Sequence, residues 1–119
     1  NLGDLVWFGP DQDMWPKGSD FAPFFGRPAC TVTTPARLAR MSGAVSIFLD
    51  LHRDDNGLYQ VSFVPMPNDY PDEDEVKNAR VLNQRIEGAL KKHPSQYMWM
   101  HKRFKTNPDL TRQTLYQSD

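Results

Sequence analysis

Leu5-Val-Trp-Phe-Gly-Pro-Asp-Gln-Asp-Met-Trp-Pro-Lys-Gly-Ser-Asp-Phe-Ala-Pro-Phe-Phe-Gly26 is the stretch that decides the fold. It sets an apolar run, residues 5–8, just before two carboxylates, Asp11 and Asp13. A continuous apolar run is typical of a strand covered on both faces, and Pro10 ends it because proline has no N–H for a ladder. Open α/β sheets bind ligands beyond the carboxyl ends of their strands. In such a sheet, Asp11 and Asp13 would stand at a ligand site. The alternative is that these aspartates only cap a turn.

Length and composition describe one ordered domain or part of one. The chain has 119 residues, 39% hydrophobic and 12% aromatic, with a net charge of −1. That charge gives no overall attraction to nucleic acid. The single cysteine, Cys30, excludes an internal disulfide and is expected to be a small buried residue. The chain starts at Asn1 and runs almost directly into the predicted strand, so we expect a piece of a longer protein.

The first half of the chain predicts an extended segment, a helix and a hairpin. Residues 21–26 are too rich in proline for a central strand and indicate an extended edge or a pocket-lining loop. Thr34-Pro35 predicts a helix start with Thr34 as the cap, Leu38 and Met41 on one face, and an end at Ser42-Gly43. Residues 44–52 alternate in polarity, and a turn with Asn-Gly leads to a second strand at 58–64. This pattern predicts an antiparallel hairpin.

The second half predicts one long helix and a block of aromatic and basic residues. Apolar side chains recur at helical spacing from Val76 to Leu90. The acids at 72–75 and the bases at 91–93 both favour the helix dipole, so the acidic run is a helix-entry device rather than a metal site. After Pro94, residues 95–105 mix aromatic and basic side chains that cannot all lie on one face of a helix. Some of these side chains should therefore pack against the protein, and the others should be exposed.

No self-sufficient catalytic site can be identified in the sequence. The three histidines are not at metal-ligand spacing, and no nucleophile elbow or phosphate-binding loop is present. Asp11-Gln12-Asp13 has the D-x-D spacing of some metal-dependent glycosyltransferases, which is a weak signal. The bases and aromatics of 97–105 suggest single-stranded nucleic acid as a third alternative, although the rest of the chain is not basic.

Four blocks, in order and spacing, resemble the carboxyl-terminal half of the lipid A biosynthesis acyltransferases, the lauroyl and myristoyl transferases of Gram-negative bacteria. The blocks are Gly9-Pro-Asp-Gln-Asp-Met-Trp-Pro-Lys17, Phe21-Ala-Pro-Phe-Phe-Gly-Arg-Pro-Ala29, Leu38-Ala-Arg-Met-Ser-Gly43 and Gln96-Tyr-Met-Trp-Met-His-Lys-Arg-Phe-Lys-Thr-Asn-Pro108. The last block is the most specific. The resemblance covers nearly the whole chain.

The resemblance implies a fold, a reaction and partners. The fold would be a partial glycerol-3-phosphate-acyltransferase-like α/β fold, a mixed sheet with an antiparallel hairpin flanked by helices, with residues 1–119 as the carboxyl-terminal portion of one domain. The reaction would move a fatty acyl chain from acyl carrier protein to a Kdo-bearing lipid A precursor, in lipopolysaccharide biosynthesis, without a cofactor, metal or nucleic acid. It would occur at the cytoplasmic face of the inner membrane, reached through an amino-terminal segment absent from this chain.

The resemblance also implies which residues matter. The family signature H-x-x-x-x-[DE] is absent from this chain. The residues five positions after its three histidines, His52, His93 and His101, are Gly57, Met98 and Thr106. The catalytic base would therefore lie upstream, and this portion alone would be inactive. Asp11 matches the first aspartate of the family's P-D-x-D block and is the predicted catalytic carboxylate, supported by Asp13. The predicted substrate-binding residues, mainly for anionic partners, are Lys17, Phe24, Phe25, His101, Lys102, Arg103 and Lys105.

Overall fold

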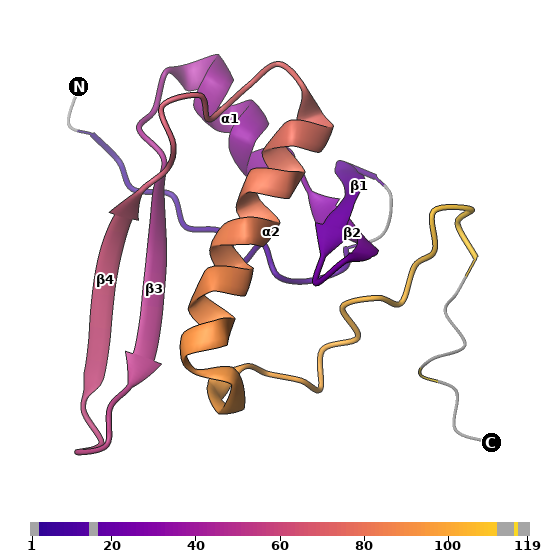
Figure 1. Cartoon of the computed structure of the whole chain (residues 1–119). Coiled ribbons are helices and arrows are strands. Elements are labelled where there is room, and N and C mark those ends of the chain that lie inside the picture. The colour runs from indigo at the N-terminus through magenta and orange to yellow at the C-terminus, as the bar shows by residue number, and fades with distance from the viewer. Residues whose placement is uncertain (1–2, 15–16, 112–115, 117–119) are drawn as a thin grey trace.

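The computed structural model describes residues 3–14, 17–111 and 116. Its elements, in chain order, are β1 (Ser19–Phe24), β2 (Arg27–Val32), α1 (Thr34–Ser42), β3 (Ile47–Arg53), β4 (Tyr59–Pro65), α2 (Glu75–Lys92) and the short 3-10 turn η1 (Pro94–Gln96). Figure 1 shows α2 at the centre, with the β1–β2 hairpin on one side and the β3–β4 hairpin on the other. Both hairpins are antiparallel and form separate two-stranded sheets.

The described residues thus form a small α/β structure, and the mixed sheet that the sequence suggested is not present among them. Residues 5–8 join neither sheet, and Leu5, Val6 and Trp7 are 75–100% exposed. The prediction of a buried strand there is wrong for this structure. An apolar run becomes a covered strand only when strands and a second layer are available beside it, and the described residues supply neither at this place.

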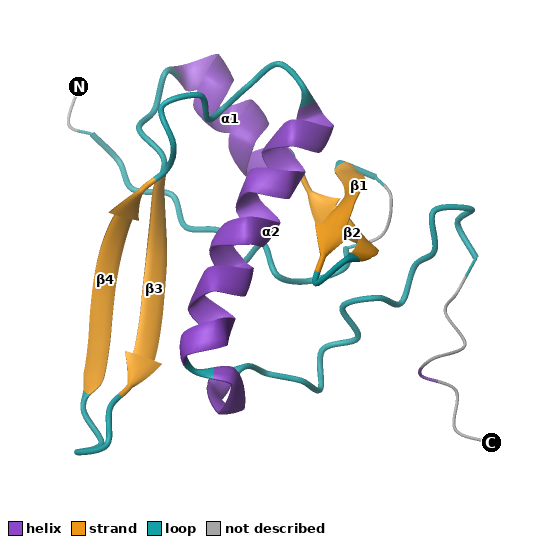
Figure 2. Cartoon of the chain, in the orientation of Figure 1, coloured by secondary structure: helices purple, strands orange, loops and turns teal. Residues whose placement is uncertain are grey.

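The core lies where the β1–β2 hairpin packs on α2. It contains Phe24 and Ala29 from the hairpin and three aliphatic side chains of the helix, Leu82, Ile86 and Leu90. Phe48 of β3, with Tyr97 and Phe104 of the chain after η1, packs against this cluster. Residues 97–111 run as turns and loops past the end of α2 and back toward β1–β2 (Figure 2). Tyr97 and Phe104 therefore hold the aromatic and basic block to the core, and only its first two residues, Ser95 and Gln96, lie in a helical turn, η1.

Helix α2 confirms the predicted helix and its entry signal. The Asp74 carboxylate accepts hydrogen bonds from the backbone N–H groups of Val76 (2.9 Å) and Lys77 (3.1 Å), as an N-cap does. Glu75 lies in the first turn, and the basic residues Lys91 and Lys92 lie in the last, which suits the helix dipole. The acidic run is a helix-entry device, as predicted.

Helix α1 is where the sequence predicts, but its details differ. The N-cap is Thr33 rather than Thr34, without a capping side-chain hydrogen bond, and Gly43 ends the helix in the left-handed conformation (φ 69°). The buried face carries Ala36 and Ala39, whereas Leu38 and Met41 are exposed, so the predicted apolar face is wrong. The face that the rest of the molecule covers is thus the one with small side chains.

The two hairpins agree with their predicted class. Residues 21–24 lie in β1, which is an edge strand, as predicted for this segment. Pro23 lies opposite Pro28 of β2, and an edge position suits both residues because proline has no backbone N–H to donate to a neighbouring strand. In β3–β4 the predicted alternation is confirmed: Phe48, Asp50 and His52 are partly buried toward the rest of the molecule, and the residues between them are exposed. Among the described residues, no helix is long and apolar enough to cross a membrane.

Candidate functional site

Two segments far apart in the sequence meet through a buried carboxylate. Asp13 is 4% exposed, and its two oxygens accept hydrogen bonds from the backbone N–H of Thr106 (2.9 Å) and from its hydroxyl (3.1 Å). Thr106 is itself fully buried. Charge-assisted hydrogen bonds in a buried setting are among the stronger polar contacts in proteins. Asp13 therefore fixes the loop after Pro10 against the aromatic and basic block, and its supporting role in a catalytic site stays a prediction.

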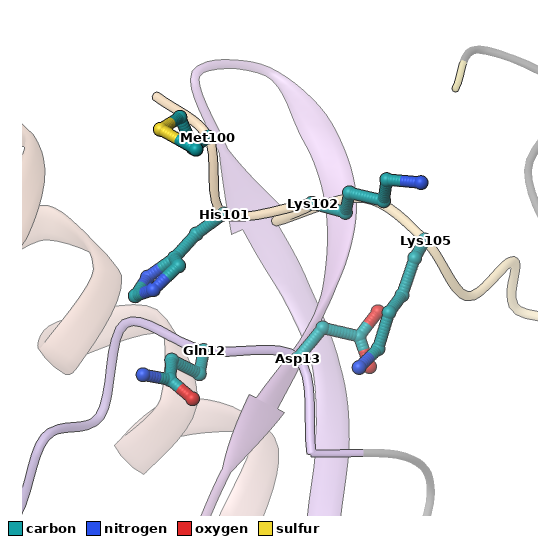
Figure 3. A pocket seen from close by; sticks show the side chains of 6 residues that line it. All are labelled: Gln12, Asp13, Met100, His101, Lys102 and Lys105. Carbon is teal, nitrogen blue, oxygen red and sulfur yellow. The ribbon is translucent and has the colours of Figure 1, made fainter. Parts of the chain in front are cut away.

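A pocket of about 280 Å³ opens between these two segments. Gln12 and Asp13 line one side, and four residues of the aromatic and basic block line the other: Met100, His101, Lys102 and Lys105 (Figure 3). The wall formed by the block contains two lysines and a histidine, and the opposite wall contains an amide and a carboxylate. The Lys102 ammonium extends away from Gln12 and Asp13 and lies 5.8 Å from the centroid of the Tyr116 ring. The structure thus brings together three of the predicted substrate-binding residues and the supporting carboxylate.

Asp11 lies next to this pocket in the chain, although it does not line it. Its carboxylate is partly buried and close enough to act electrostatically on two residues of the aromatic and basic block. Burial raises the pKa of the Tyr97 phenol, and the negative charge of Asp11 raises it further. The same charge favours the protonated form of Arg103. Asp11 therefore lies within electrostatic range of the carboxyl-terminal block, whereas its catalytic role stays a prediction.

Arg103 does not present its charge to a partner, which corrects the prediction for that residue. It is 2% exposed, and its guanidinium donates to the Cys30 carbonyl (2.6 Å), the Thr31 hydroxyl (2.7 Å) and the Asn83 side-chain oxygen (3.0 Å). It also lies over the Phe24 ring, 5.1 Å from its centroid. Burial lowers the pKa of Arg103 from its ordinary value, but guanidinium stays protonated in proteins. Arg103 ties β2, α2 and the block together.

Sequence reasoning did not find the polar network around Arg103. Asn83 donates to the Pro23 carbonyl (3.0 Å) and to the Thr31 hydroxyl (3.0 Å), so it connects α2 to both strands of the hairpin. The available signal was the position of Asn83 between Ala79 and Ile86 on the buried face of α2. A polar residue on such a face is kept only when its hydrogen bonds are satisfied.

The other predicted substrate-binding residues lie apart from the pocket lining. Phe24 is 1% exposed and belongs to the core, so its surface is already used in packing. Phe25 is exposed at the β1–β2 turn, where its backbone N–H donates to Glu87 (2.8 Å) and its ring lies 5.9 Å from the Lys91 ammonium. Lys17 is exposed just before β1. The structure assigns no shared site to these three residues.

Three buried polar atoms around Asp11 and the pocket have no hydrogen-bond partner within the described part of the chain. They are the Tyr97 hydroxyl, Nδ1 of His101 and Nε of Arg103. Buried polar atoms are nearly always paired in folded proteins because an unpaired one has lost its hydration without compensation. Each of these three atoms can therefore accept or donate a further hydrogen bond to a group outside the described residues.

Nothing in the described ranges forms a metal centre. No group of three or more histidine, cysteine, aspartate or glutamate side chains is placed to hold a metal ion there. His52 and His93 stack face to face, with ring centroids 4.0 Å apart, instead of converging on a point. Cys30 is fully buried, and burial raises the pKa of its thiol, which disfavours the reactive thiolate. The prediction of a small buried residue at Cys30 is confirmed.

Comparison of the sequence with known protein families shows to which family this chain belongs. The sequence matches the family described as bacterial lipid A biosynthesis acyltransferase over residues 1–106. This chain belongs to that family. The match includes the loop after Pro10, the pocket and Thr106, so every part of the candidate site described above lies within it.

Curated relatives within this lipid A acyltransferase family agree. The chain is 41% identical over 108 residues to the lipid A biosynthesis palmitoleoyltransferase of Escherichia coli (strain K12) and 38% identical over 109 residues to its lauroyltransferase. It is 38% identical over 117 residues to a lipid A biosynthesis acyltransferase of Haemophilus influenzae. These alignments cover 89–95% of this chain but only 35–37% of the relatives. The chain therefore spans about a third of their length.

Proposed function

We propose that this chain is the carboxyl-terminal portion of an enzyme that transfers a fatty acyl chain from acyl carrier protein to a Kdo-bearing lipid A precursor. Family membership is the observation that carries the proposal. It favours acyl transfer over the two alternatives, a D-x-D glycosyltransferase and a nucleic-acid-binding module. The acceptor class follows from the names of the relatives, and the donor follows from the resemblance described above.

The catalytic groups come partly from this portion and partly from the rest of the protein. The acceptor hydroxyl attacks the acyl thioester and must lose a proton, so a base in the site lowers the barrier. We assign that base to a histidine outside this chain and assign to Asp11 the carboxylate that orients it or binds the acceptor. Asp13 holds this loop in place through Thr106. Portion 1–119 alone is then expected to be inactive.

The unpaired atoms of the cluster support a site that other groups complete. The Tyr97 hydroxyl and His101 Nδ1 are buried beside Asp11 and the pocket without hydrogen-bond partners among the described residues. Substrate or upstream side chains would supply them in the assembled enzyme. Such an arrangement is expected when catalytic groups come from separate parts of a chain.

The pocket fits an anionic group. Lys102 and Lys105 supply two cations on one wall, with His101 beside them. Phosphate and carboxylate groups of a lipid A precursor, or the acidic surface of acyl carrier protein, are partners that such a wall attracts. We place the enzyme at the cytoplasmic face of the bacterial inner membrane, held there by a segment outside the described residues.

The proposal is tested with the full-length protein, acyl carrier protein carrying a single fatty acyl chain, and a Kdo-bearing lipid A precursor. Mass spectrometry should show a precursor heavier by one acyl group and free acyl carrier protein as the second product. Unloaded acyl carrier protein is the control for the donor. Transfer of a sugar from a nucleotide sugar in the presence of Mn²⁺, with no acyl transfer, would show the proposal to be wrong.

The double substitution Lys102→Ala with Lys105→Ala is expected to weaken binding of the anionic partner. Each lost charge-assisted contact should raise KM by about 5- to 10-fold at low salt, and the effect should shrink as salt screens the charges. Steady-state kinetics at two ionic strengths measure it. Lys92→Ala is the matched control, because Lys92 is an exposed lysine at the end of α2 that does not line the pocket. An unchanged KM in the double variant would remove these lysines from the binding site.

A further inference from the structure

The outer face of the β3–β4 hairpin is apolar and uncovered. The register pairs Leu49 with Phe63 and Leu51 with Val61, and Ile47 lies opposite Pro65 at the end of the ladder. Residues that pair directly across a ladder point to the same face, so all six side chains share one surface. The five large hydrophobic side chains among them are 40–69% exposed. No charged residue interrupts this face from Ile47 to Leu51 on β3 or from Val61 to Pro65 on β4.

The opposite face of the same hairpin is the one that meets the molecule. Phe48 packs against the core cluster, and the Arg53 backbone at the end of β3 is bonded to the Gln96 side chain by two hydrogen bonds of 2.7 and 2.8 Å. The hairpin is thus covered on one side only. A two-stranded hairpin is marginal by itself, and a sheet with one large apolar face normally buries it against a further layer. The outer face therefore needs an occupant.

We infer that this outer face docks an upstream segment of the same polypeptide and forms an internal layer of the complete acyltransferase. Relatives in the family extend to about three times the length that this chain covers, so a family member has ample chain to supply that layer. The inference rests on family membership and does not need the proposed reaction to be correct. The exposed run Leu5–Phe8 is a second apolar segment with the same requirement.

The chemistry of the face favours a protein layer over the two other occupants. A surface that binds anionic membranes mixes apolar side chains with lysine and arginine at its rim. Arg53, the base that follows in register on this face, lies beyond the pair of Leu51 and Val61, and its Nε donates to the Gly57 carbonyl (3.2 Å) within the hairpin turn. A continuous apolar face without charges is typical of a domain interior. A second copy of the protein is the remaining occupant.

The test is thiol accessibility in the purified full-length protein, using Val61→Cys at the centre of the face. Asp55→Cys, in the exposed turn of the same hairpin, is the matched control. Labelling by a bulky maleimide is measured for both variants against the unmodified protein, whose Cys30 is fully buried. We expect Val61→Cys to react more slowly than Asp55→Cys by about tenfold or more in the monomer, because a docked layer must open before the thiol is reached. Urea should abolish the difference.

Three outcomes would overturn the inference. Equal labelling of the two variants in the native monomer would mean that the face is uncovered. Protection that is lost on dilution, together with dissociation of a dimer, would assign the face to a second copy. Protection that appears only when anionic phospholipid vesicles are added would assign it to a membrane surface. Because the readout is labelling and not turnover, it is independent of the acyl transfer assay.

Discussion

Asp11→Ala in the full-length protein is expected to lower the rate of acyl transfer by about 10²- to 10⁴-fold, the range that a group acting in proton transfer or its orientation supplies. Asp11 is partly buried, and its carboxylate acts electrostatically on Tyr97 and Arg103. It directly precedes Gln12 and Asp13, which line the pocket. The loss should appear in kcat. Asp13, which anchors the loop through Thr106, is unchanged by this substitution, so the melting temperature should shift little.

Two companion variants separate chemistry from structure. Asp11→Asn keeps the size of the side chain and removes the charge, so it should lose most of the activity as well. Asp55→Ala, an exposed aspartate in the β3–β4 turn, should retain full activity. Turnover of the Asp11→Ala enzyme close to that of the unmodified enzyme would refute the role of Asp11. A fall in activity that follows only the fall in melting temperature would make Asp11 structural.

Arg103→Ala should destabilise the protein by about 3–5 kcal/mol, as expected when one partner of a buried charged network is removed. The substitution leaves the Cys30 carbonyl, the Thr31 hydroxyl and the Asn83 side-chain oxygen without this donor. It also opens space over the Phe24 ring. Each loss acts at the contact between the β1–β2 hairpin and α2, where the core lies.

Urea unfolding of the full-length protein, followed by circular dichroism, measures this effect. Lys102→Ala is the control, because Lys102 is the exposed neighbour and an exposed lysine should contribute less than about 0.5 kcal/mol. Arg103→Lys should be intermediate, since a lysine keeps the charge but cannot reach three acceptors with one planar group. A loss below about 1 kcal/mol for Arg103→Ala would mean that the network contributes little and that Arg103 is available for another role.

The elements that local signals define were predictable from the sequence. The cap at Asp74, the acids before α2 and the Asn-Gly turn between β3 and β4 each act within a few residues, and the helix and the hairpin formed accordingly. The meeting of the P-D-x-D loop with the carboxyl-terminal block could be expected only through the resemblance. The structure then supplied its cause, the hydrogen bonds from Thr106 to Asp13.

Burial and long-range pairing were the parts that the sequence could not predict. Leu38 and Met41 look like a core face, yet two alanines of α1 are buried instead, because the packing of neighbours decides which face is covered. Arg103 is expected on the surface because it is a charged residue in a basic run with Lys102 and Lys105. Its acceptors at Cys30 and Thr31 are 73 and 72 positions away in the sequence, a separation that no local pattern encodes.

The contact between Asp13 and Thr106 also sets an order of events during synthesis. These residues are 93 positions apart, and they hold the two walls of the pocket together. While the ribosome is still translating the segment between them, one wall exists and the other does not. A nascent or prematurely terminated chain that ends before Met100 carries Gln12 and Asp13 but none of the residues that line the opposite wall.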